Sequence, residues 1–210
     1  IDDFHILSSG VYNLGFIAVG PGSDEFINWW WQKTRREALV DHSRMMFTDQ
    51  RWVDFVPSFF NHFILKDPTY NVAYWNLHTR DLTWNDGAYL VNGRPLTFFH
   101  FSGFDPRKPH LLSKHQGDRP RILLSESPAV ARICREYVDR LERAGLSRES
   151  AIPYGWKMLA GGIPFDRRMR RLYREGIERH EKGLGPSPPG PFDKGAEPLF
   201  MEWLNERVAG

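Results

Sequence analysis

The chain has 210 residues, with 28 Lys and Arg against 26 Asp and Glu, so its formal net charge is only +2. This balance excludes a chain-wide surface for polyanions such as nucleic acid. The apolar fraction of 41% is that of a globular protein, and a chain of this length buries roughly 70% of its unfolded surface.

No stretch approaches the roughly 20 consecutive apolar residues of a membrane-spanning helix. The single cysteine, Cys134, excludes a disulfide framework within the chain and is expected to be a buried, inert thiol. This cysteine usage indicates a reducing compartment and predicts a cytoplasmic location. The chain starts without Met and enters a strand pattern almost at once, which predicts that it is part of a longer, multidomain polypeptide.

The first half of the sequence predicts strands and aromatic packing. Ser23 is expected to cap a helix that runs to Ala38, and Thr48 a short helix that Pro57 closes. β-Branched and aromatic runs bounded by turn residues predict strands. These are residues 10–19, 70–75, a hairpin over 82–91 around Asn85-Asp86-Gly87, and 95–101 after the Asn92-Gly93 turn.

The second half predicts helices joined by polar segments. A basic loop over residues 105–127 precedes a helix that begins at Ser127-Pro128 and ends at Gly145. A second helix spans about 166–180, a Gly- and Pro-rich linker covers 183–191, and a last short helix covers 199–204. We therefore expect one domain over residues 1–125 and a helical appendage over 126–210.

The helix after Asp166 is crowded with arginines and has several interpretations. It is a solvated face packed on the main domain, a surface for an anionic acceptor or lipid, or an interface with a partner. Nucleic-acid binding is the least favoured, because stacking groups are not interleaved with the arginines and no recognised motif is present.

Four polar clusters could carry chemistry: Tyr12-Asn13-Leu14-Gly15, Thr48-Asp49-Gln50, Tyr70-Asn71, and His100-Phe101-Ser102-Gly103 with Lys108 behind it. Taken singly, each has a structural explanation, such as a hydrogen-bonded histidine or a carboxylate at a helix start. Ligands of open α/β sheets bind beyond the carboxyl ends of strands. We therefore expect the 95–101 strand to deliver the His100 imidazole to a site, with cations nearby to meet negative charge.

The order of these clusters resembles the C-terminal half of GT-A fold glycosyltransferases, especially the family-8-like retaining enzymes. The matching motifs are Asn13-Leu14-Gly15, Asp49-Gln50, Asn71 and His100-Phe101-Ser102-Gly103, within a resemblance that covers about residues 6–116 and continues more loosely to the end. The sequence around these motifs is similar to the first domain of certain bacterial multidomain glycosyltransferases. The resemblance implies an α/β fold, the C-terminal part of a GT-A mixed sheet with flanking helices, plus a C-terminal helical appendage.

The resemblance also implies a set of roles. The donor would be a nucleotide-diphosphate sugar and the acceptor a carbohydrate or another hydroxyl compound, with no nucleic-acid partner. Mn²⁺ or Mg²⁺ would bridge the diphosphate, with His100 as a metal ligand. Gly103 and Lys108 would contact the phosphates. Asp49 and Gln50 would be catalytic, beside the anomeric carbon. Asn13, Gly15 and Asn71 would lie on the donor side.

Two departures from the family pattern matter. The Asp-x-Asp motif that supplies the other metal ligands is absent from this sequence, which implies that the missing N-terminal half of the domain carries it together with the uridine-binding part. The spacing after His100 is His-x-x-Gly-x-x-x-x-Lys-Pro-His, two residues longer than in the family, and His110 replaces a Trp. Arg107 and Lys114 are therefore alternatives to Lys108.

Two other functions remain open. One is a non-catalytic GT-A-like scaffold or glycan-binding module within a larger glycosyltransferase. The other is a metal-dependent hydrolase that uses His100, Asp49 and Asp105. It is less favoured, because no second histidine sits at ligand spacing within a secondary element.

Overall fold

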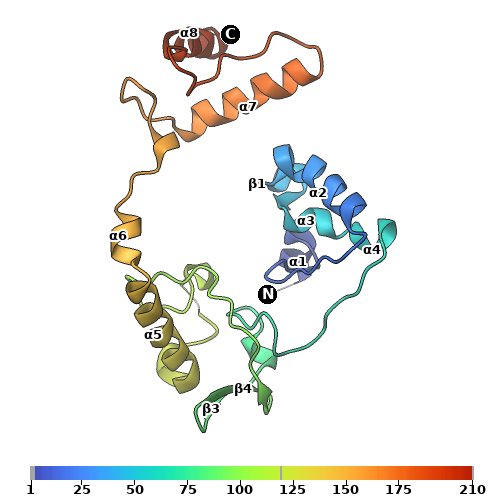
Figure 1. The fold of residues 1–210 in the computed structure, drawn as a ribbon, viewed down its shortest axis with the longest axis vertical. Coiled ribbons are helices and arrows are strands. Elements are labelled where there is room, and N and C mark those ends of the chain that lie inside the picture. The colour runs from blue at the N-terminus through green and yellow to red at the C-terminus, as the bar shows by residue number, and fades with distance from the viewer. Residues whose placement is uncertain (1–2, 119, 210) are drawn as a thin grey trace. The chain divides into compact units, whose positions relative to one another are not determined.

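The computed structural model describes residues 3–118 and 120–209. It is a mixed α/β structure with small sheets and several helices (Figure 1). The chain forms two compact units, Ile1–Arg140 and Leu141–Gly210. The α/β class expected from the sequence is confirmed, and the GT-A assignment stays a prediction.

The first part of unit 1 is helical around one short hairpin. Its elements are α1 (Asp3–Ser9), α2 (Asp24–Glu37), β1 (Leu39–Asp41), η1 (His42–Arg44), β2 (Met46–Thr48), α3 (Gln50–Val53) and α4 (Val56–Phe59). β1 and β2 pair antiparallel, with Leu39 opposite Thr48. The expected helix after Ser23 is confirmed, although the Ser23 hydroxyl accepts from Gly20 N (3.2 Å) and does not cap the helix.

Aromatic rings pack α2 against α3 and α4. The Trp29 ring lies 6.4 Å from that of Trp52 and 5.3 Å from that of Phe60. Three consecutive indoles cannot face one core on a helix, and Trp31 accordingly keeps 60% of its surface exposed. Edge-to-face and offset contacts of this kind are a favourable way to pack rings. This packing fixes α3, on which Gln50 stands.

The middle part of the unit 1 sequence forms a three-stranded antiparallel sheet, in which β4 lies between β3 and β5. It follows η2 (Leu77–Thr79) and consists of β3 (Leu82–Asn85), β4 (Ala88–Val91) and β5 (Arg94–Pro95). Both connections are two-residue turns with positive φ at each position, 46° and 85° at Asp86-Gly87 and 51° and 78° at Asn92-Gly93. Turns of this geometry match strand twist and favour Asn-Gly and Asp-Gly pairs. The predicted hairpin is confirmed.

The long strands expected at 10–19, 70–75 and 95–101 are not formed. Residues 10–19 are turns and extended backbone outside any strand, and the other two segments share one parallel bridge, Val72 to Phe99. An extended segment becomes a strand only where a neighbour pairs with its backbone groups. Phe16 instead packs through its ring, 5.2 Å from that of Tyr70. The apolar patterns reflect ring packing here and not sheet ladders.

The last part of unit 1 closes its core. Its elements are η3 (Lys114–Gln116), η4 (Leu124–Glu126) and α5 (Pro128–Arg143). Val130, Ile133 and Cys134 of α5 pack into a buried cluster with Val72, Leu77, Leu82, Val91 and Leu112. Burial raises the pKa of the Cys134 thiol to about 12, so this thiol is unreactive at neutral pH. Leu112 and Ser113 are also buried, so the expected free loop over 105–127 is partly packed.

Unit 2 is an aromatic-centred helical unit. It contains α6 (Leu146–Ser150), η5 (Gly155–Lys157), α7 (Arg167–Glu181) and α8 (Glu197–Ala209). Its core is Leu159, Phe165, Phe200, Trp203 and Leu204. Asp166 caps α7 by accepting from Met169 N (2.8 Å), and the helix predicted from about residue 166 is confirmed. Across the described residues, no helix is both long and apolar enough to traverse a bilayer.

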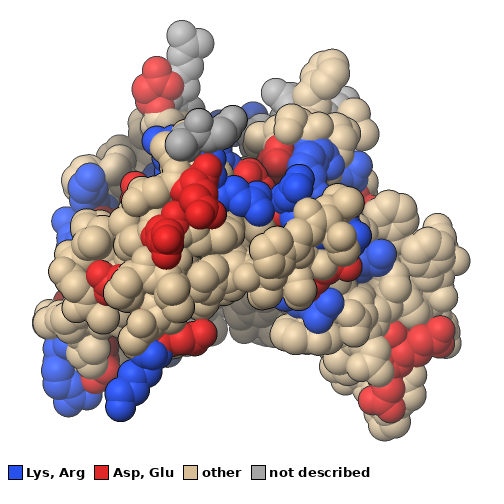
Figure 2. Space-filling view, turned by 90° about the horizontal axis from the view of Figure 1, so that it is seen from above, with Lys and Arg blue, Asp and Glu red and all other residues tan. Residues whose placement is uncertain are grey.

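The arginines of α7 are largely used within unit 2. Arg170 donates to the carbonyls of Phe165 (3.0 Å) and Trp156 (2.8 Å), and it lies over the Phe165 ring. Arg171 and Arg174 face Glu175 and Glu178 one turn further on. Figure 2 shows that Lys and Arg side chains and Asp and Glu side chains both occur on the face in view. These contacts within unit 2 favour the interpretation that the arginine-rich face of α7 is solvated, whereas its packing on the main domain stays a prediction.

Candidate functional site

The site is built where residues 71–72 cross residues 98–100. Val72 N donates to Phe98 O (3.3 Å), and His100 N donates to Val72 O (2.7 Å). These two bonds place the side chain of Asn71 beside that of His100, although the two residues are 29 positions apart. Asn71 adopts a left-handed backbone conformation (φ 52°), which asparagine tolerates better than most residues.

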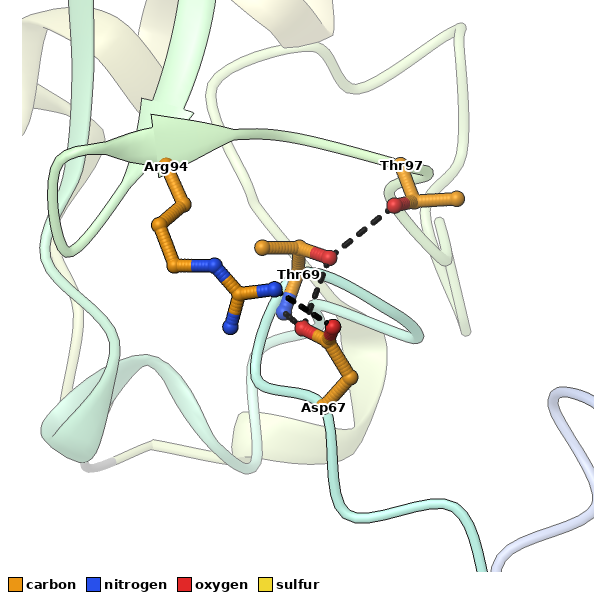
Figure 3. Close-up of polar contacts among 4 residues, drawn as sticks. All are labelled: Asp67, Thr69, Arg94 and Thr97. Carbon is orange, nitrogen blue, oxygen red and sulfur yellow. Dashed lines mark hydrogen bonds and ion pairs between the residues drawn. The ribbon is translucent and has the colours of Figure 1, made fainter.

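A separate polar cluster holds the start of this crossing (Figure 3). The carboxylate of Asp67 accepts from Thr69 N (2.9 Å) and Thr69 Oγ1 (2.8 Å) and pairs with Arg94 (2.7 Å). Thr69 Oγ1 also bonds Thr97 Oγ1 (2.9 Å). Thr69 is only 3% exposed. The backbone bond from Thr69 lowers the Asp67 pKa the most, followed by the Thr69 hydroxyl and Arg94.

Side-chain amides connect three further segments to His100. Gln50 Nε2 donates to Ser9 O (2.9 Å), and Asn13 Nδ2 donates to Gln50 Oε1 (3.1 Å). Asn71 Nδ2 donates to Asn13 Oδ1 (2.7 Å), and Asn71 Oδ1 lies 2.8 Å from His100 Nδ1. The sequence predicted each of these four side chains as a site residue, and the structure joins them in one chain of hydrogen bonds.

The backbone of Gly15 lies directly against this network. A Cβ added at Gly15 would overlap Asn71 Oδ1 and come within 2.5 Å of His100 Nδ1. Real Cβ atoms do not make such contacts, so a larger residue at position 15 would force the side chains of Asn71 and His100 to shift. The sequence predicted Gly15 on the donor side, and the structure places it against Asn71 and His100.

Burial lowers the pKa of His100 and so favours the neutral form of its imidazole. The His100 imidazole packs edge to face with the Trp75 ring, and the two ring centroids are 5.1 Å apart. A neutral imidazole keeps one nitrogen with a free lone pair, which suits it to accept a proton or to bind a metal.

Asp49 lies next to the network through Gln50 but does not join it. Its carboxylate is half-buried and makes no hydrogen bond or ion pair with any residue that the structure describes. Thr48 before it has φ 50°, an uncommon conformation for a β-branched residue that costs about 1–3 kcal/mol. The expected Thr48 cap is wrong, because Asp49 takes the cap position and neither side chain caps α3.

The segment after His100 folds back on Gly103. Lys114 N donates to Gly103 O (3.0 Å), and a Cβ on Gly103 would overlap His115 and come within 2.6 Å of Ser113 Oγ. His115 stacks on Tyr74 with ring centroids 6.1 Å apart. Burial lowers the pKa of His115 the most, followed by the charge of Lys114. Sequence reasoning missed Ser113 and His115, which carry no periodic signal.

Lys108 lies elsewhere in the same segment. Its backbone N–H donates to Asp105 O (2.8 Å) in an exposed turn. Within the described residues, its side chain forms no hydrogen bond or ion pair with the network. The structure therefore brings Lys114, and not Lys108, next to the His-x-x-Gly motif.

A pocket of about 410 Å³ opens beside His100 and Gly15. Its walls are Phe98, Phe99, Phe101 and Tyr137, and no Lys, Arg, Asp or Glu lines it. Tyr137 of α5 stacks on Phe101, with the ring centroids 3.8 Å apart and the rings 8° from parallel. No local sequence pattern links Tyr137 to Phe101, so this contact could not be predicted from the sequence.

No group of three or more His, Cys, Asp or Glu side chains that could hold a metal ion occurs among the described residues. His100 supplies one nitrogen ligand by itself, which is not a complete metal site.

Comparisons with known proteins give two similar chains, both of Bacillus subtilis (strain 168). The chain is 30% identical over 99 residues to "Uncharacterized protein YfnF", covering 45% of this chain and 33% of that protein. It is 31% identical over 101 residues to "Uncharacterized protein YfnD", covering 46% of this chain and 32% of that protein.

The similarity thus spans about a third of the length of each relative. No family model matches the chain. No solved structure matches it either.

Proposed function

We propose that this chain is part of a glycosyltransferase that moves a sugar from a nucleotide-diphosphate sugar to a hydroxyl acceptor. The resemblance implies that the transfer proceeds with retention and that nucleic acid is not a partner. The observation that supports this most is the convergence of Asn13, Gly15, Gln50, Asn71 and His100. These residues come from four separate segments, and each belongs to a motif of the family that the sequence resembles.

Asp49 is the candidate for work at the anomeric carbon. Both polar ends of the Gln50 amide are engaged, to Asn13 and to Ser9. The carboxylate of Asp49 has no such partner within the described residues and is half-buried. A carboxylate of this kind can stabilise the positive charge that develops on a sugar ring in glycosyl transfer. Gln50 then acts by placing Asp49 and the network.

We assign the phosphate-binding cation to Lys114 in place of Lys108. The resemblance implies a cationic side chain next to the His-x-x-Gly motif. The backbone N–H of Lys114 donates to the carbonyl of Gly103, the glycine of this motif. A Lys ammonium binds phosphate as a point charge and so does not require one fixed geometry.

The pocket beside His100 fits an uncharged sugar ring better than a phosphate. Its walls are aromatic and carry no cation, and ligand pockets combine apolar walls with a few polar groups. The same observation favours the second candidate, a glycan-binding scaffold within a larger glycosyltransferase. The two candidates differ in whether the nucleotide part of a donor is bound.

The divalent metal stays a prediction, and no step of the proposal is routed through it. His100 would be one ligand, and the chemistry supplied by the metal would be neutralisation of the leaving diphosphate. The cytoplasmic location and the dependence on further parts of a longer polypeptide are likewise predictions.

For the hydrolase alternative, Asp105 is the least suitable of the three residues that the sequence suggested. The carboxylate of Asp105 accepts from Arg107 Nε (3.0 Å) and Nη2 (3.1 Å). This pairing with the guanidinium, which is the largest cause, lowers the pKa of Asp105. A carboxylate held in this way is poorly placed to serve as a base with His100.

The test uses the natural polypeptide that carries these residues, incubated with UDP-glucose, UDP-galactose, UDP-N-acetylglucosamine or GDP-mannose, with diamagnetic Mg²⁺ for the binding measurement and Mn²⁺ for turnover. Saturation-transfer NMR reports binding, and release of the nucleoside diphosphate reports turnover. We expect at least one donor to bind through both its nucleotide and its sugar. Binding of methyl glycosides without any nucleotide sugar would favour the scaffold instead, and binding of neither would overturn both candidates.

A further inference from the structure

The amide network has a direction that its two ends determine. At one end, the backbone N–H of Gly15 donates to Asn13 Oδ1 (2.9 Å), and a backbone N–H can only donate. At the other end, Gln50 Nε2 meets the backbone carbonyl of Ser9 (2.9 Å), which can only accept. The oxygen and nitrogen of an amide side chain are assigned from such partners.

These two ends fix every amide between them. Because Asn13 Oδ1 faces the Gly15 N–H, Asn13 Nδ2 faces Gln50 Oε1, which agrees with Gln50 Nε2 facing Ser9. Asn13 Oδ1 also accepts from Asn71, so Asn71 presents its Nδ2 there. The oxygen of Asn71 is therefore the atom that faces His100.

An amide oxygen only accepts, so the His100 nitrogen beside it must carry a hydrogen. We propose that Gln50, Asn13 and Asn71 form a directed amide relay that holds His100 in its Nδ1–H tautomer and leaves Nε2 as the free, lone-pair nitrogen. In this arrangement Asn13 and Asn71 are positioning residues and not contacts of the donor sugar. The assignment of the tautomer does not depend on the proposed function. Only the role of Nε2 as a metal ligand or proton acceptor rests on the proposed function.

The surroundings leave the relay little freedom. Asn76 Nδ2 donates to the carbonyl of Asn71 (2.8 Å), and Ala73 N donates to Asn76 Oδ1 (2.9 Å), which holds Asn71 in its left-handed conformation. Gly15 closes on the contact between Asn71 and His100 so tightly that a Cβ cannot enter. Hydrogen-bonded partners that fix a histidine tautomer in this way are common behind metal-binding and proton-transferring imidazoles.

The relay is tested by NMR of the chain labelled with ¹⁵N at histidine, at pH 8, where the ring is neutral. We expect the His100 signals of a protonated Nδ1 and an unprotonated Nε2. Asn71→Ala should shift His100 toward the Nε2–H form, and Asn13→Ala should do so in part. The exposed amide of Asn61 provides the matched control, since Asn61→Ala should leave the spectrum unchanged.

Asn71→Asp separates the role of the acceptor from that of the fold. Its carboxylate accepts from Nδ1 but cannot donate to Asn13, so the Nδ1–H form of His100 should persist while the rest of the relay is broken. An Nε2–H form in the unmodified chain, or an unchanged His100 in a folded Asn71→Ala variant, would overturn the relay. If Asn71→Ala does not fold, the unmodified chain and Asn71→Asp still decide. An Nδ1–H form with no nucleotide-sugar binding would instead overturn only the proposed function.

Discussion

Two polar clusters of unit 1 differ in whether their polar side-chain groups all have hydrogen-bond or ion-pair partners. The cluster of Asp67, Thr69, Arg94 and Thr97 is closed, because the Asp67 carboxylate is met by a backbone N–H, a hydroxyl and a guanidinium. The network around His100 is built of neutral amides and ends on an imidazole, with the carboxylate of Asp49 beside it and outside it. A polar cluster that stabilises a crossing uses up its groups, whereas one that serves a ligand keeps some of them available.

The largest expected effect is on His100. His100→Ala should lower sugar transfer by the natural polypeptide about 100-fold or more, the usual cost of losing a residue that handles charge or protons in the reaction. Initial rates of nucleoside diphosphate release measure it. His78→Ala, at an exposed histidine of η2, is the control and should retain full activity. Equal rates for the two variants would remove His100 from the site.

Gly15 provides a matched pair of substitutions for stability. Gly15→Ala forces a Cβ into Asn71 and His100, and overpacking of this kind costs about 1–3 kcal/mol. At Gly20, a Cβ meets nothing within 4 Å, so Gly20→Ala should be close to neutral. Urea unfolding of both variants measures the difference. A Gly15→Ala variant as stable as Gly20→Ala would show that the contact is looser than the structure has it.

The two lysines of the loop can be compared directly. Lys114→Ala should weaken binding of UDP about tenfold, the cost of one charge-assisted hydrogen bond. Lys108→Ala should change UDP binding little, because Lys108 lies in an exposed turn and its backbone bonds Asp105 and not Gly103. Calorimetric titration of the natural polypeptide and of each variant with UDP and Mn²⁺ measures the two dissociation constants. The reverse order would return the phosphate role to Lys108.

The smallest effect concerns acid stability through the closed cluster. The pKa of Asp67 is lower in the folded chain than its ordinary 3.8, so its stabilising contribution is present above that value and is lost as the pH falls through the lowered pKa. Asp67→Asn removes this contribution, so the stability of the variant should depend less on pH below 4 than that of the unmodified chain. Thermal unfolding across this range measures the difference. Parallel pH profiles would mean that the hydrogen bonds from Thr69 and the ion pair with Arg94 do not persist in solution.

Much of the site could be predicted from sequence because motif residues carry local signals. Asn13, Gly15, Gln50, Asn71 and His100 were all singled out, and the structure brings them together. Their connections could not be predicted, since no local pattern shows that Asn13 donates to Gln50 or that Asn71 meets His100. Ser113, His115 and Tyr137 were missed for the same reason, because they reach Gly103 and Phe101 only through folding of the chain.

The sequence by itself determined the features that a few neighbouring residues encode. Asp86-Gly87 and Asn92-Gly93 specify their turns through positive φ, and Pro128 begins α5. Only the tertiary structure decided what the extended segments do, since a strand needs backbone partners that its own residues do not supply. It also decided the orientation of the His100 network, because the backbone groups of Ser9 and Gly15 set the direction of every amide between them.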